Sequence, residues 1–283
     1  MCQICTKFGG GRYRYEMLPL ANLRFDWLRS MWSRRQPRDA IFIFIKHAID
    51  RLSNDAMAEL ADRARGIIVD PVDRSLAAMP HKHIDIVLAC SIAQHAALSE
   101  TWPAQGPKVE LLLHQADLRL YGLTAPPMDV FRPAYFGNPL NLSLPAPLSK
   151  EIPSIDVGLS GGMTAALPLF RQYNFHYGVR PQIQVGSDQV FKPLTKAITA
   201  AVLGAPIMIN RDAHDAIALL GADYPYLVDS TGDADVIRMF EKAQTGFKGS
   251  EWALALDKMR SLGSRLSPAR VAEDLEHILE TLT

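Results

Sequence analysis

The chain has 283 residues, of which 48% are hydrophobic and 21% are charged. It is long enough to bury two cores of ordinary size. Thirty basic side chains balance 30 acidic ones. The protein therefore has no net charge that would attract it to nucleic acid, and we expect no nucleic-acid partner. Any site for an anion must therefore be local.

Three cysteines are too few for a disulfide framework and indicate a reducing compartment. Cys2 and Cys5 are spaced as in metal and redox sites, but no second pair or nearby His completes a zinc set, so we predict a buried strand over residues 1–8. No apolar run is long enough to span a bilayer, and the N-terminus lacks a signal-peptide pattern. These features predict a cytoplasmic protein, with the inner membrane surface as an alternative location.

Short apolar runs alternate with helical stretches in the first half of the chain. Because this alternation is typical of a parallel sheet covered on both faces, we predict a first α/β domain over residues 1–150. Seven prolines between 124 and 153 indicate the connection to a second domain, with 132–136 as a last strand. The expected strands are 41–45, 66–70, 84–90 and 108–114, and the expected helices are 17–33, 53–66 and 92–101.

A second α/β series follows, and we assign it to a domain over residues 151–283. Its expected strands are 155–160, 175–179, 206–209 and 226–228, and its expected helices are one after Met163, 193–203, 213–220, 234–245, 251–262 and 267–282. The predicted fold class is α/β, with two Rossmann-like domains whose parallel sheets face a central cleft. Ligands of such sheets bind beyond the carboxyl ends of the strands, so the loops after the strands are the candidate sites.

In the first domain, polar residues follow the expected strands. His47 follows IFIFI, Asp70 and Asp73 follow GIIV, and His114 follows KVELLL; each could exchange a proton or a hydrogen bond with a substrate. In the alternative, Asp73 caps the next helix, and His47 is a polar residue whose hydrogen bonds are made within the protein. Two carboxylates are too few for a dedicated metal site.

The stretch GGGRYRYEMLP, residues 9–19, is rich in glycine. Its glycines, Gly10 and Gly11 among them, would let backbone amides approach a ligand closely, and a plain loop is the alternative.

In the second domain, the candidates suit phosphate. Ser160 and Gly161 form a turn between a strand and a helix, and Arg180 follows FHYGV. Lys192 and Lys196 lie at the start of a helix of small residues. The start of a helix carries a partial positive charge, so a lysine there is unfavourable unless an anion binds beside it. A diphosphate there would be held by free helical amides and these cations, whereas the alternative makes both lysines solvated surface residues. Asn210 and Arg211 end the strand that follows and face the same edge.

The stretch F-K-P-L-T-K-A-I-T-A-A-V-L-G-A-P-I-M-I, residues 191–209, is similar to the donor-side element K-x-x-E-A-x-A-x-G-x-P-V-I of GT-B glycosyltransferases. The glycine-rich loop and the strand ends IFIFIKH and IIVDPVD support the resemblance, which covers most of the chain as architecture. It implies transfer of a sugar from a nucleoside-diphosphate donor to a surface polysaccharide, a lipid-linked glycan or a protein. It requires no metal and no cofactor besides the donor substrate, and it allows C-terminal helices that fold back on the first domain.

The resemblance also implies roles for individual residues. Gly10, Gly11 and His47 would lie on the acceptor side, and Asp70, Asp73 or His114 would be the base of an inverting reaction. The donor would be bound by Ser160, Gly161, Arg180, Lys192, Thr195, Lys196, Asn210 and Arg211.

One departure from the family pattern concerns the donor ribose. Where many members carry a glutamate that binds it, this helix offers Lys196, Ala197 and Thr199. A catalytically inactive nucleotide-binding or partner protein with the same fold is therefore the alternative. A nicotinamide-dependent oxidoreductase is disfavoured, because no G-x-G-x-x-G follows any expected strand.

Residues 17–38 are amphipathic and contain Trp27, Trp32 and a basic end, SRRQPR. Such a segment could rest on an anionic membrane surface, although we favour ordinary helix packing.

Overall fold

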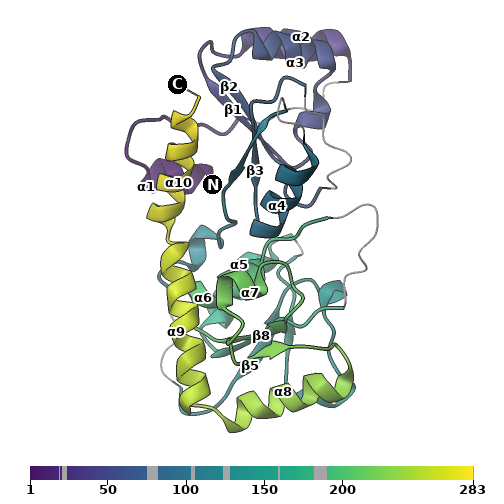
Figure 1. The fold of residues 1–283 in the computed structure, drawn as a ribbon, viewed down its shortest axis with the longest axis vertical. Helices are drawn as coiled ribbons and strands as arrows, with labels where there is room; N and C mark the ends of the chain where they lie inside the picture. The colour runs from purple at the N-terminus through teal and green to yellow at the C-terminus, as the bar shows by residue number, and fades with distance from the viewer. Residues whose placement is uncertain are drawn as a thin grey trace. The chain divides into compact units, whose positions relative to one another are not determined.

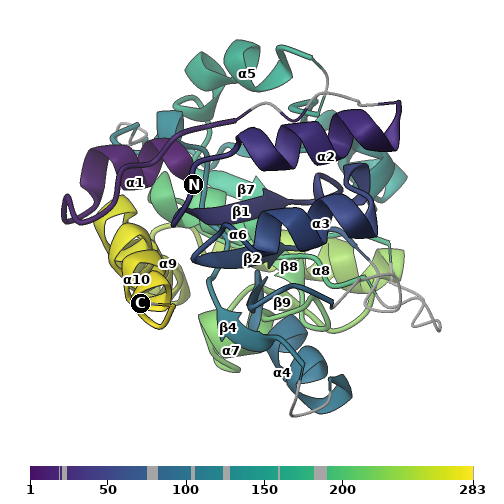
Figure 2. The ribbon, with the colours of Figure 1, turned by 90° about the horizontal axis from the view of Figure 1, so that it is seen from above.

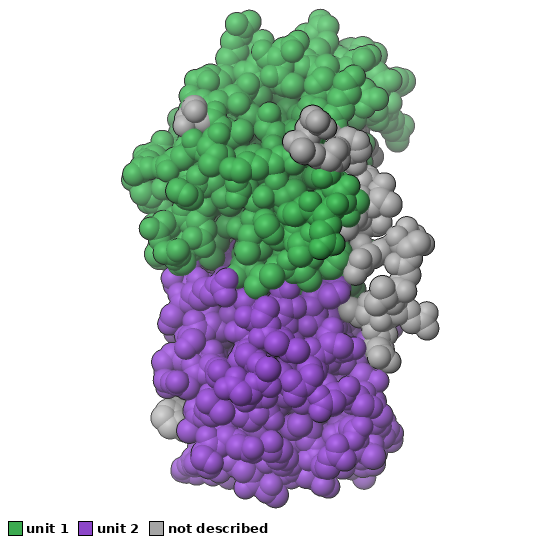
Figure 3. All heavy atoms as spheres, in the orientation of Figure 1, with its two compact units in different colours: residues 1–114, 185–193, 268–283 green, residues 115–184, 194–267 purple. Residues whose placement is uncertain are grey.

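The computed structural model describes residues 1–18, 20, 24–74, 82–102, 106–123, 128–158, 160–181 and 190–282. The chain divides into two compact units, green and purple in Figure 3. Unit 1 comprises residues 1–114, 185–193 and 268–283, and unit 2 comprises residues 115–184 and 194–267. The first segment of unit 1 therefore ends at residue 114, before the domain boundary expected near residue 150.

Unit 1 is built on a four-stranded parallel sheet in the order β1-β2-β3-β4. The strands are β1 (Ile41–Ile45), β2 (Gly66–Asp70), β3 (Ile86–Ala89) and β4 (Lys108–Leu111). Every residue of β2 and β3 is buried, as expected of inner strands whose two faces are both covered. In register, Ile41 pairs with Gly66 and Ile45 pairs with Asp70, so the carboxyl ends of β1 and β2 lie together.

Serine caps mark the starts of two helices of unit 1. Between residues 26 and 101 the helices are α2 (Asp26–Arg35), α3 (Asn54–Ala61) and α4 (Ile92–Thr101), with a 3-10 turn, η1 (Ile49–Arg51), after β1. Ser53 Oγ accepts a hydrogen bond from Ala56 N at the start of α3, and Ser91 Oγ accepts one from Gln94 N at the start of α4. Figure 2 shows α2 and α3 side by side.

Helix α2 begins at Asp26, not near residue 17, so the described residues between 17 and 25 are not helical. Trp32 packs against the core of unit 1, as ordinary helix packing predicts, whereas Trp27 is exposed. Residues 19 and 21–23 of the expected helix lie outside the described residues. Within the described ranges, no helix has the length and apolar character that crossing a bilayer requires.

The first eight residues do not form the predicted strand. They form helix α1 (Cys2–Phe8), which packs on α10 (Pro268–Glu280) and buries Ile4 and Cys5. Figure 1 shows this pair as purple beside yellow. The prediction was wrong because the apolar positions of so short a run fit a helix as well as a strand, and α10 supplies a helical partner from the other end of the chain. The last helix thus belongs to unit 1, although we had assigned it to the second domain.

Unit 2 contains a five-stranded parallel sheet in the order β6-β5-β7-β8-β9. Its strands are β5 (Pro133–Phe136), β6 (Ser154–Ile155), β7 (Phe175–Tyr177), β8 (Ile207–Asn210) and β9 (Leu227–Val228). Residues 133–136 are therefore an inner strand of the second sheet and not the last strand of the first. Prolines on both sides suggested a linker, but the pairing of β5 with β6 and β7 depends on residues far along the chain.

The helices of unit 2 are α5 (Gly162–Phe170), α6 (Thr195–Val202), α7 (Ala216–Leu220), α8 (Asp233–Thr245) and α9 (Ser250–Arg265). Among the described residues of unit 2, three 3-10 turns precede α5: η3 (Leu118–Leu120), η4 (Pro139–Asn141) and η5 (Ala146–Lys150). Phe131 contacts the rings of Phe175, Phe240 and Trp252. This aromatic cluster holds α8 and α9 near the start of β7, which leaves the carboxyl end of the sheet for other contacts.

Candidate functional site

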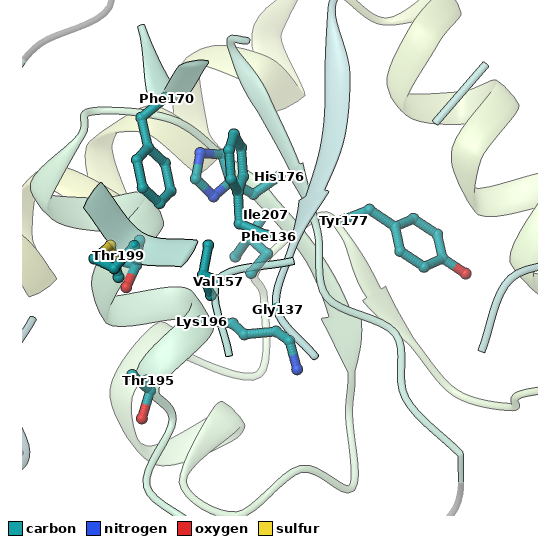
Figure 4. A pocket seen from close by; sticks show the side chains of 11 residues that line it. Phe136, Gly137, Val157, Phe170, His176, Tyr177, Thr195, Lys196, Thr199 and Ile207 are labelled. Atoms are coloured by element: carbon teal, nitrogen blue, oxygen red, sulfur yellow. The ribbon is translucent and has the colours of Figure 1, made fainter. Parts of the chain in front are cut away.

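The strand order of unit 2 changes direction at β5. The chain runs from β5 to β6 on one side and continues with β7, β8 and β9 on the other. In open parallel sheets, such a switch leaves a crevice beyond the carboxyl ends of the strands, where ligands bind. A cavity of about 190 Å³ lies at this place, lined by Phe136 and Gly137 from β5 and its loop and by His176 and Tyr177 from β7 (Figure 4).

One wall of the cavity is aromatic. Phe136 stacks on Phe170 with ring centroids 4.1 Å apart, and His176 lies 5.1 Å from Phe136; Figure 4 shows the three rings together. His176 is only 3% exposed, and its Nε2 has no hydrogen-bond partner among the described residues. Burial lowers the pKa of His176 to about 3, so the ring is neutral at physiological pH.

The other wall belongs to helix α6, through Thr195, Lys196 and Thr199. The Lys196 ammonium lies 5.1 Å from the centre of the Tyr135 ring, a cation–π distance. A Cβ on Gly137 would stand 2.6 Å from Tyr135 Oη and 3.1 Å from Lys196 Cε, so the absence of a side chain at Gly137 lets Lys196 pass. Figure 4 shows the lysine reaching toward this glycine.

Of the two lysines expected at this helix start, Lys196 lies in the first turn of α6, which begins at Thr195. Lys192 is exposed and precedes the helix, in the segment assigned to unit 1.

Arg180 follows β7 and is fixed by its main chain. Its N–H donates to Asn210 Oδ1 at 2.9 Å, and its carbonyl accepts from Asn210 Nδ2 at 3.0 Å. Partial burial lowers the pKa of the Arg180 guanidinium, and Asp212 opposes that shift. The pKa of His214 is lowered by burial first and by Arg180 second, while Asp215 and Asp212 raise it.

Arg180, Asp212, His214 and Asp215 therefore lie near one another at the carboxyl edge of unit 2. We did not single out His214 from the sequence, although its place four residues after the end of β8 is a signal that could have found it.

The other residues expected on the donor side lie at the same edge. The Arg211 guanidinium pairs with Asp229 and donates to the Ala222 carbonyl at 3.2 Å, so it ties the loops after β8 and β9 together. Gly161 has φ +80 at the start of α5, with open space where a side chain would stand. Ser160 precedes it and is exposed.

The carboxyl edge of the unit 1 sheet gathers three of the residues expected there, Asp70, Asp73 and His114, beside Lys46. Lys46 Nζ lies 3.2 Å from Asp73 Oδ2, and Lys46 N donates to the Asp70 carbonyl at 2.8 Å. Burial raises the pKa of Asp70 to about 6, although Val72 N donates to its carboxylate at 3.3 Å. Burial lowers the pKa of His114, against the opposing effect of Asp73. The residues that Asp73 would cap, 75–81, lie outside the described ones.

His47 lies on the loop after β1, where Nδ1 is 3.1 Å from Asp50 Oδ2. Asp50 Oδ1 in turn lies 3.0 Å from the guanidinium of Arg74. Neither Asp50 nor Arg74 was a candidate from the sequence.

The glycine-rich loop is held by the chain itself. Gly10 N lies 3.0 Å from both carboxylate oxygens of Glu276 on α10, and Tyr15 Oη donates to the same carboxylate at 3.4 Å. The Gly10 amide expected to approach a ligand is thus already bound to an anion of the protein. Gly11 has φ +76 and open space around its Cα. In the part of the chain that the structure describes, no group of three or more His, Cys, Asp or Glu could hold a metal ion.

By sequence, no family model and no curated protein matches the chain. By structure, it is similar to a trehalose-6-phosphate synthase studied in glycosyl transfer with retention, at TM-score 0.59 and 9% identity over 91% of this chain and 78% of that one. It is also similar to HepE of Anabaena in complex with UDP, at TM-score 0.58 and 10% identity over 89% and 80%.

A third similar structure is the pneumococcal O-GlcNAc transferase GtfA in complex with UDP and GlcNAc, at TM-score 0.59 and 12% identity over 90% of this chain. The chain spans 60% of the GtfA chain and 60% of the one matched in the GtfA/B complex. Identities this low speak for the fold alone, and they confirm the α/β class with two parallel sheets. The chain therefore has the fold of the GT-B glycosyltransferases.

Proposed function

We propose that this chain is a metal-independent glycosyltransferase that binds a nucleoside-diphosphate sugar at the carboxyl edge of unit 2. The observation that carries the proposal is the cavity at the switch between β5 and β7, with the first turns of α6 as one wall. An aromatic wall beside the start of a helix and a lysine suits a nucleotide. The base can stack on the aromatic rings, and the anionic diphosphate can bind the helix start and the lysine.

The cavity is smaller than the 300–1,000 Å³ or so of pockets that enclose whole drug-sized ligands, so it would take only part of the donor. We place the base or ribose against Phe136 and Val157 and the diphosphate at the start of α6, near Lys196. Ser160, Gly161 and Arg180 of unit 2 would complete the phosphate site, with His214 as a further hydrogen-bond donor. HepE and GtfA bind UDP, which makes a uridine nucleotide the first candidate.

The reaction would be displacement at the anomeric carbon. The bond from that carbon to the diphosphate breaks, and the cationic groups of unit 2 stabilise the departing anion. His47, Asp70, Asp73 and His114 of unit 1 would serve the acceptor, which we propose to be a glycan, a lipid-linked glycan or a protein. An inverting reaction would use one of them as base, whereas a retaining reaction would need no strong base.

One observation favours a second candidate, a nucleotide-binding or partner protein without turnover. Lys196 and Thr199 occupy the helix that carries a ribose-binding glutamate in many GT-B glycosyltransferases, and both line the cavity. Binding without transfer would fit this replacement.

Calorimetric titration with UDP, GDP and ADP tests the donor site. We expect at least one to bind, and Lys196→Met, which keeps the length of the side chain and removes its charge, to weaken binding about 10- to 100-fold. Lys258→Met, which breaks the pair with Asp223 at 2.8 Å, is the matched control and should bind normally. Release of nucleoside diphosphate from the corresponding nucleotide sugar then separates an enzyme from a binding protein. Failure of all three nucleotides to bind would contradict both.

A further inference from the structure

The helix that borders the cavity of unit 2 carries no carboxylate, but a neighbouring strand supplies one. Helix α6 contains no Asp or Glu, and none of the described residues that line the cavity is acidic. Asp156 directly follows β6, the strand that pairs with β5. We propose that the Asp156 carboxylate accepts hydrogen bonds from the ribose hydroxyl groups of the bound nucleotide. This rests on the nucleotide site of the proposed function and names the residue that recognises its ribose.

The register of the sheet puts Asp156 beside the cavity. Phe136 pairs in parallel with Ile155, and Gly137 N donates to the Ile155 carbonyl at 3.0 Å. The next residues along the two segments are Gly137 and Asp156, which therefore lie opposite each other. Gly137 lines the cavity, and so does Val157, which follows Asp156; Figure 4 shows both. Asp156 is thus next to two residues of the cavity wall.

The direction of the Asp156 side chain follows from the same pairing. Residues opposite each other on parallel strands point to the same face of a sheet. A Cβ at Gly137 would point toward Tyr135 Oη and Lys196 Cε, and Asp156 shares this direction. Burial raises the pKa of Tyr135 to about 12, and the negative charge of Asp156 adds to that rise. The carboxylate therefore lies close to the Tyr135 hydroxyl, on the side of the strand where Lys196 passes.

The carboxylate is held in place and still has room for a ligand. Asp156 Oδ1 accepts a hydrogen bond from Gly158 N at 2.7 Å, and the residue is half-buried. An ionised carboxylate has about four lone-pair sites on its two oxygens, so one bond to Gly158 leaves it able to accept more. The two adjacent hydroxyl groups of a ribose are donors that match its two oxygens. A neutral amide or a lysine at this place could not accept from both.

The position in the fold is one at which ribose is recognised in Rossmann-like domains. There, an acidic side chain at the end of the second strand, about 20 residues after the glycine turn of the first, hydrogen-bonds a ribose hydroxyl group. Asp156 follows the strand after β5 and lies about 20 residues beyond Gly137. Other carboxylates at this edge face cations: Asp229 pairs with Arg211, and Asp212 lies near Arg180.

Calorimetric titration with UDP, GDP and ADP, each beside its 2′,3′-dideoxy analogue, tests the assignment. The analogue keeps the base and the diphosphate and lacks both hydroxyl groups. We expect the wild type to bind at least one nucleotide about 10- to 100-fold more tightly than its analogue, as hydrogen bonds to an ionised group would give. Asp156→Ala should bind the same two ligands with affinities within about threefold of each other.

The ratio of the two affinities is the quantity to compare, because it cancels other effects of the substitution. Removing a negative charge near the diphosphate changes the affinity for both ligands alike, and so does a loss of stability. Asp156→Asn keeps an oxygen for Gly158 N and removes the charge, so we expect a lower ratio at the melting temperature of the wild type. This variant replaces Asp156→Ala if the latter fails to fold.

A matched control is available at the start of η3. Asp117 Oδ1 accepts from Arg119 N at 2.9 Å, a contact of the same i,i+2 kind, and Asp117→Ala should keep the ratio of the wild type. An unchanged ratio in Asp156→Ala would overturn the assignment, as would an equal fall in Asp117→Ala. Equal affinity of the wild type for a nucleotide and its analogue would also overturn it and leave the proposed function standing. If the wild type binds none of the three nucleotides, the proposed function itself fails, and the assignment fails with it.

Discussion

Asn210 holds the main chain of Arg180 with both atoms of its side-chain amide. Oδ1 accepts from Arg180 N at 2.9 Å, and Nδ2 donates to Arg180 O at 3.0 Å. Asn210 ends β8 and is only 2% exposed, so it links the loops that follow β7 and β8. The direction of the Arg180 main chain thus depends on Asn210, whether or not Asn210 itself touches a ligand.

Asn210→Ala should therefore weaken nucleotide binding as well as stability. Removing a buried amide leaves two main-chain groups unsatisfied, at about 1–3 kcal/mol each, and frees the loop that carries Arg180. Thermal unfolding and calorimetric titration with UDP measure the two effects. Asn174→Ala is the matched control, because Asn174 holds Arg132 N and Val130 O in the same way at the amino ends of β5 and β7. It should destabilise unit 2 without changing nucleotide affinity, and equal effects of both variants on affinity would contradict the role of Arg180.

Gly137→Ala should close the passage of Lys196 at the cavity. The added Cβ would meet Tyr135 Oη at 2.6 Å and Lys196 Cε at 3.1 Å. The lysine is flexible and will move, whereas the Tyr135 ring is buried and bound to the Asn138 carbonyl at 2.7 Å. We expect a loss of about 1–3 kcal/mol from overpacking and about tenfold weaker nucleotide binding. Gly232→Ala, whose Cβ would meet only Ser230 Oγ at 3.3 Å, should change neither by as much; normal binding by Gly137→Ala would argue against a phosphate at Lys196.

Asp70→Asn should show whether the Asp70 carboxylate takes part in catalysis or only in the structure. Burial raises the pKa of Asp70 from 3.8 to about 6, so folding is penalised by the ionised group as the pH rises through this window. The stability advantage of the variant over the wild type should therefore grow by about 2 kcal/mol between pH 4 and pH 6.5. Urea unfolding at the two pH values measures this difference. A gain in stability together with a loss of turnover is expected of a group held at a functional site, whereas full turnover would remove Asp70 from the candidates.

The local sequence pattern was sufficient to predict those strands and helices whose structure depends mainly on their own residues. IFIFI and GIIVD form strands at the predicted positions, and α4 matches its prediction, because apolar runs and a serine cap are local signals. The start of α3 was predicted for the same reason. The GT-B resemblance rested on one such stretch, residues 191–209, in which a helix, a glycine turn and a strand follow one another.

Pairing between distant segments was the part that local pattern could not predict. The strand expected at the N-terminus is a helix because α10 covers it, and β5 joins the second sheet because β6 and β7 flank it. The same reason explains the site. Arg74 pairs with Asp50, and Arg180 lies near His214, across stretches of sequence that no local pattern connects, and the Gly10 amide is bound by a carboxylate 266 positions further on.

Glu276→Ala should release the N-terminal segment from α10. The carboxylate is buried and accepts from Gly10 N and from Tyr15 Oη, so its removal leaves donors unsatisfied at a cost of about 1–3 kcal/mol. We expect a lower melting temperature and faster trypsin cleavage at Arg12 and Arg14. Glu273→Ala on the same helix loses only an exposed pair with Arg270 at 3.2 Å and should resist trypsin like the wild type. Unchanged cleavage in Glu276→Ala would mean that α1 alone holds the segment.

His176→Phe should make the protein less sensitive to acid. The pKa of the buried ring is lowered from 6.5 to about 3, so the unfolded chain binds one more proton between these values and the wild type loses stability as the pH falls. Between pH 7 and pH 5 this one group should cost the wild type about 2 kcal/mol, and phenylalanine, which has no group to protonate, should escape that loss.

Urea unfolding of both proteins at pH 7 and pH 5 measures the difference. Tyr173→Phe removes the hydroxyl of another ring beside Phe136 and should keep the pH dependence of the wild type. If His176→Phe and the wild type lose the same stability, the ring reaches water in the folded protein, and the cavity wall it forms is more open than its burial indicates. A donor that packs against this wall should then protect the wild type against acid less than it protects His176→Phe, because excluding water from the imidazole makes its protonation unfavourable in the bound state.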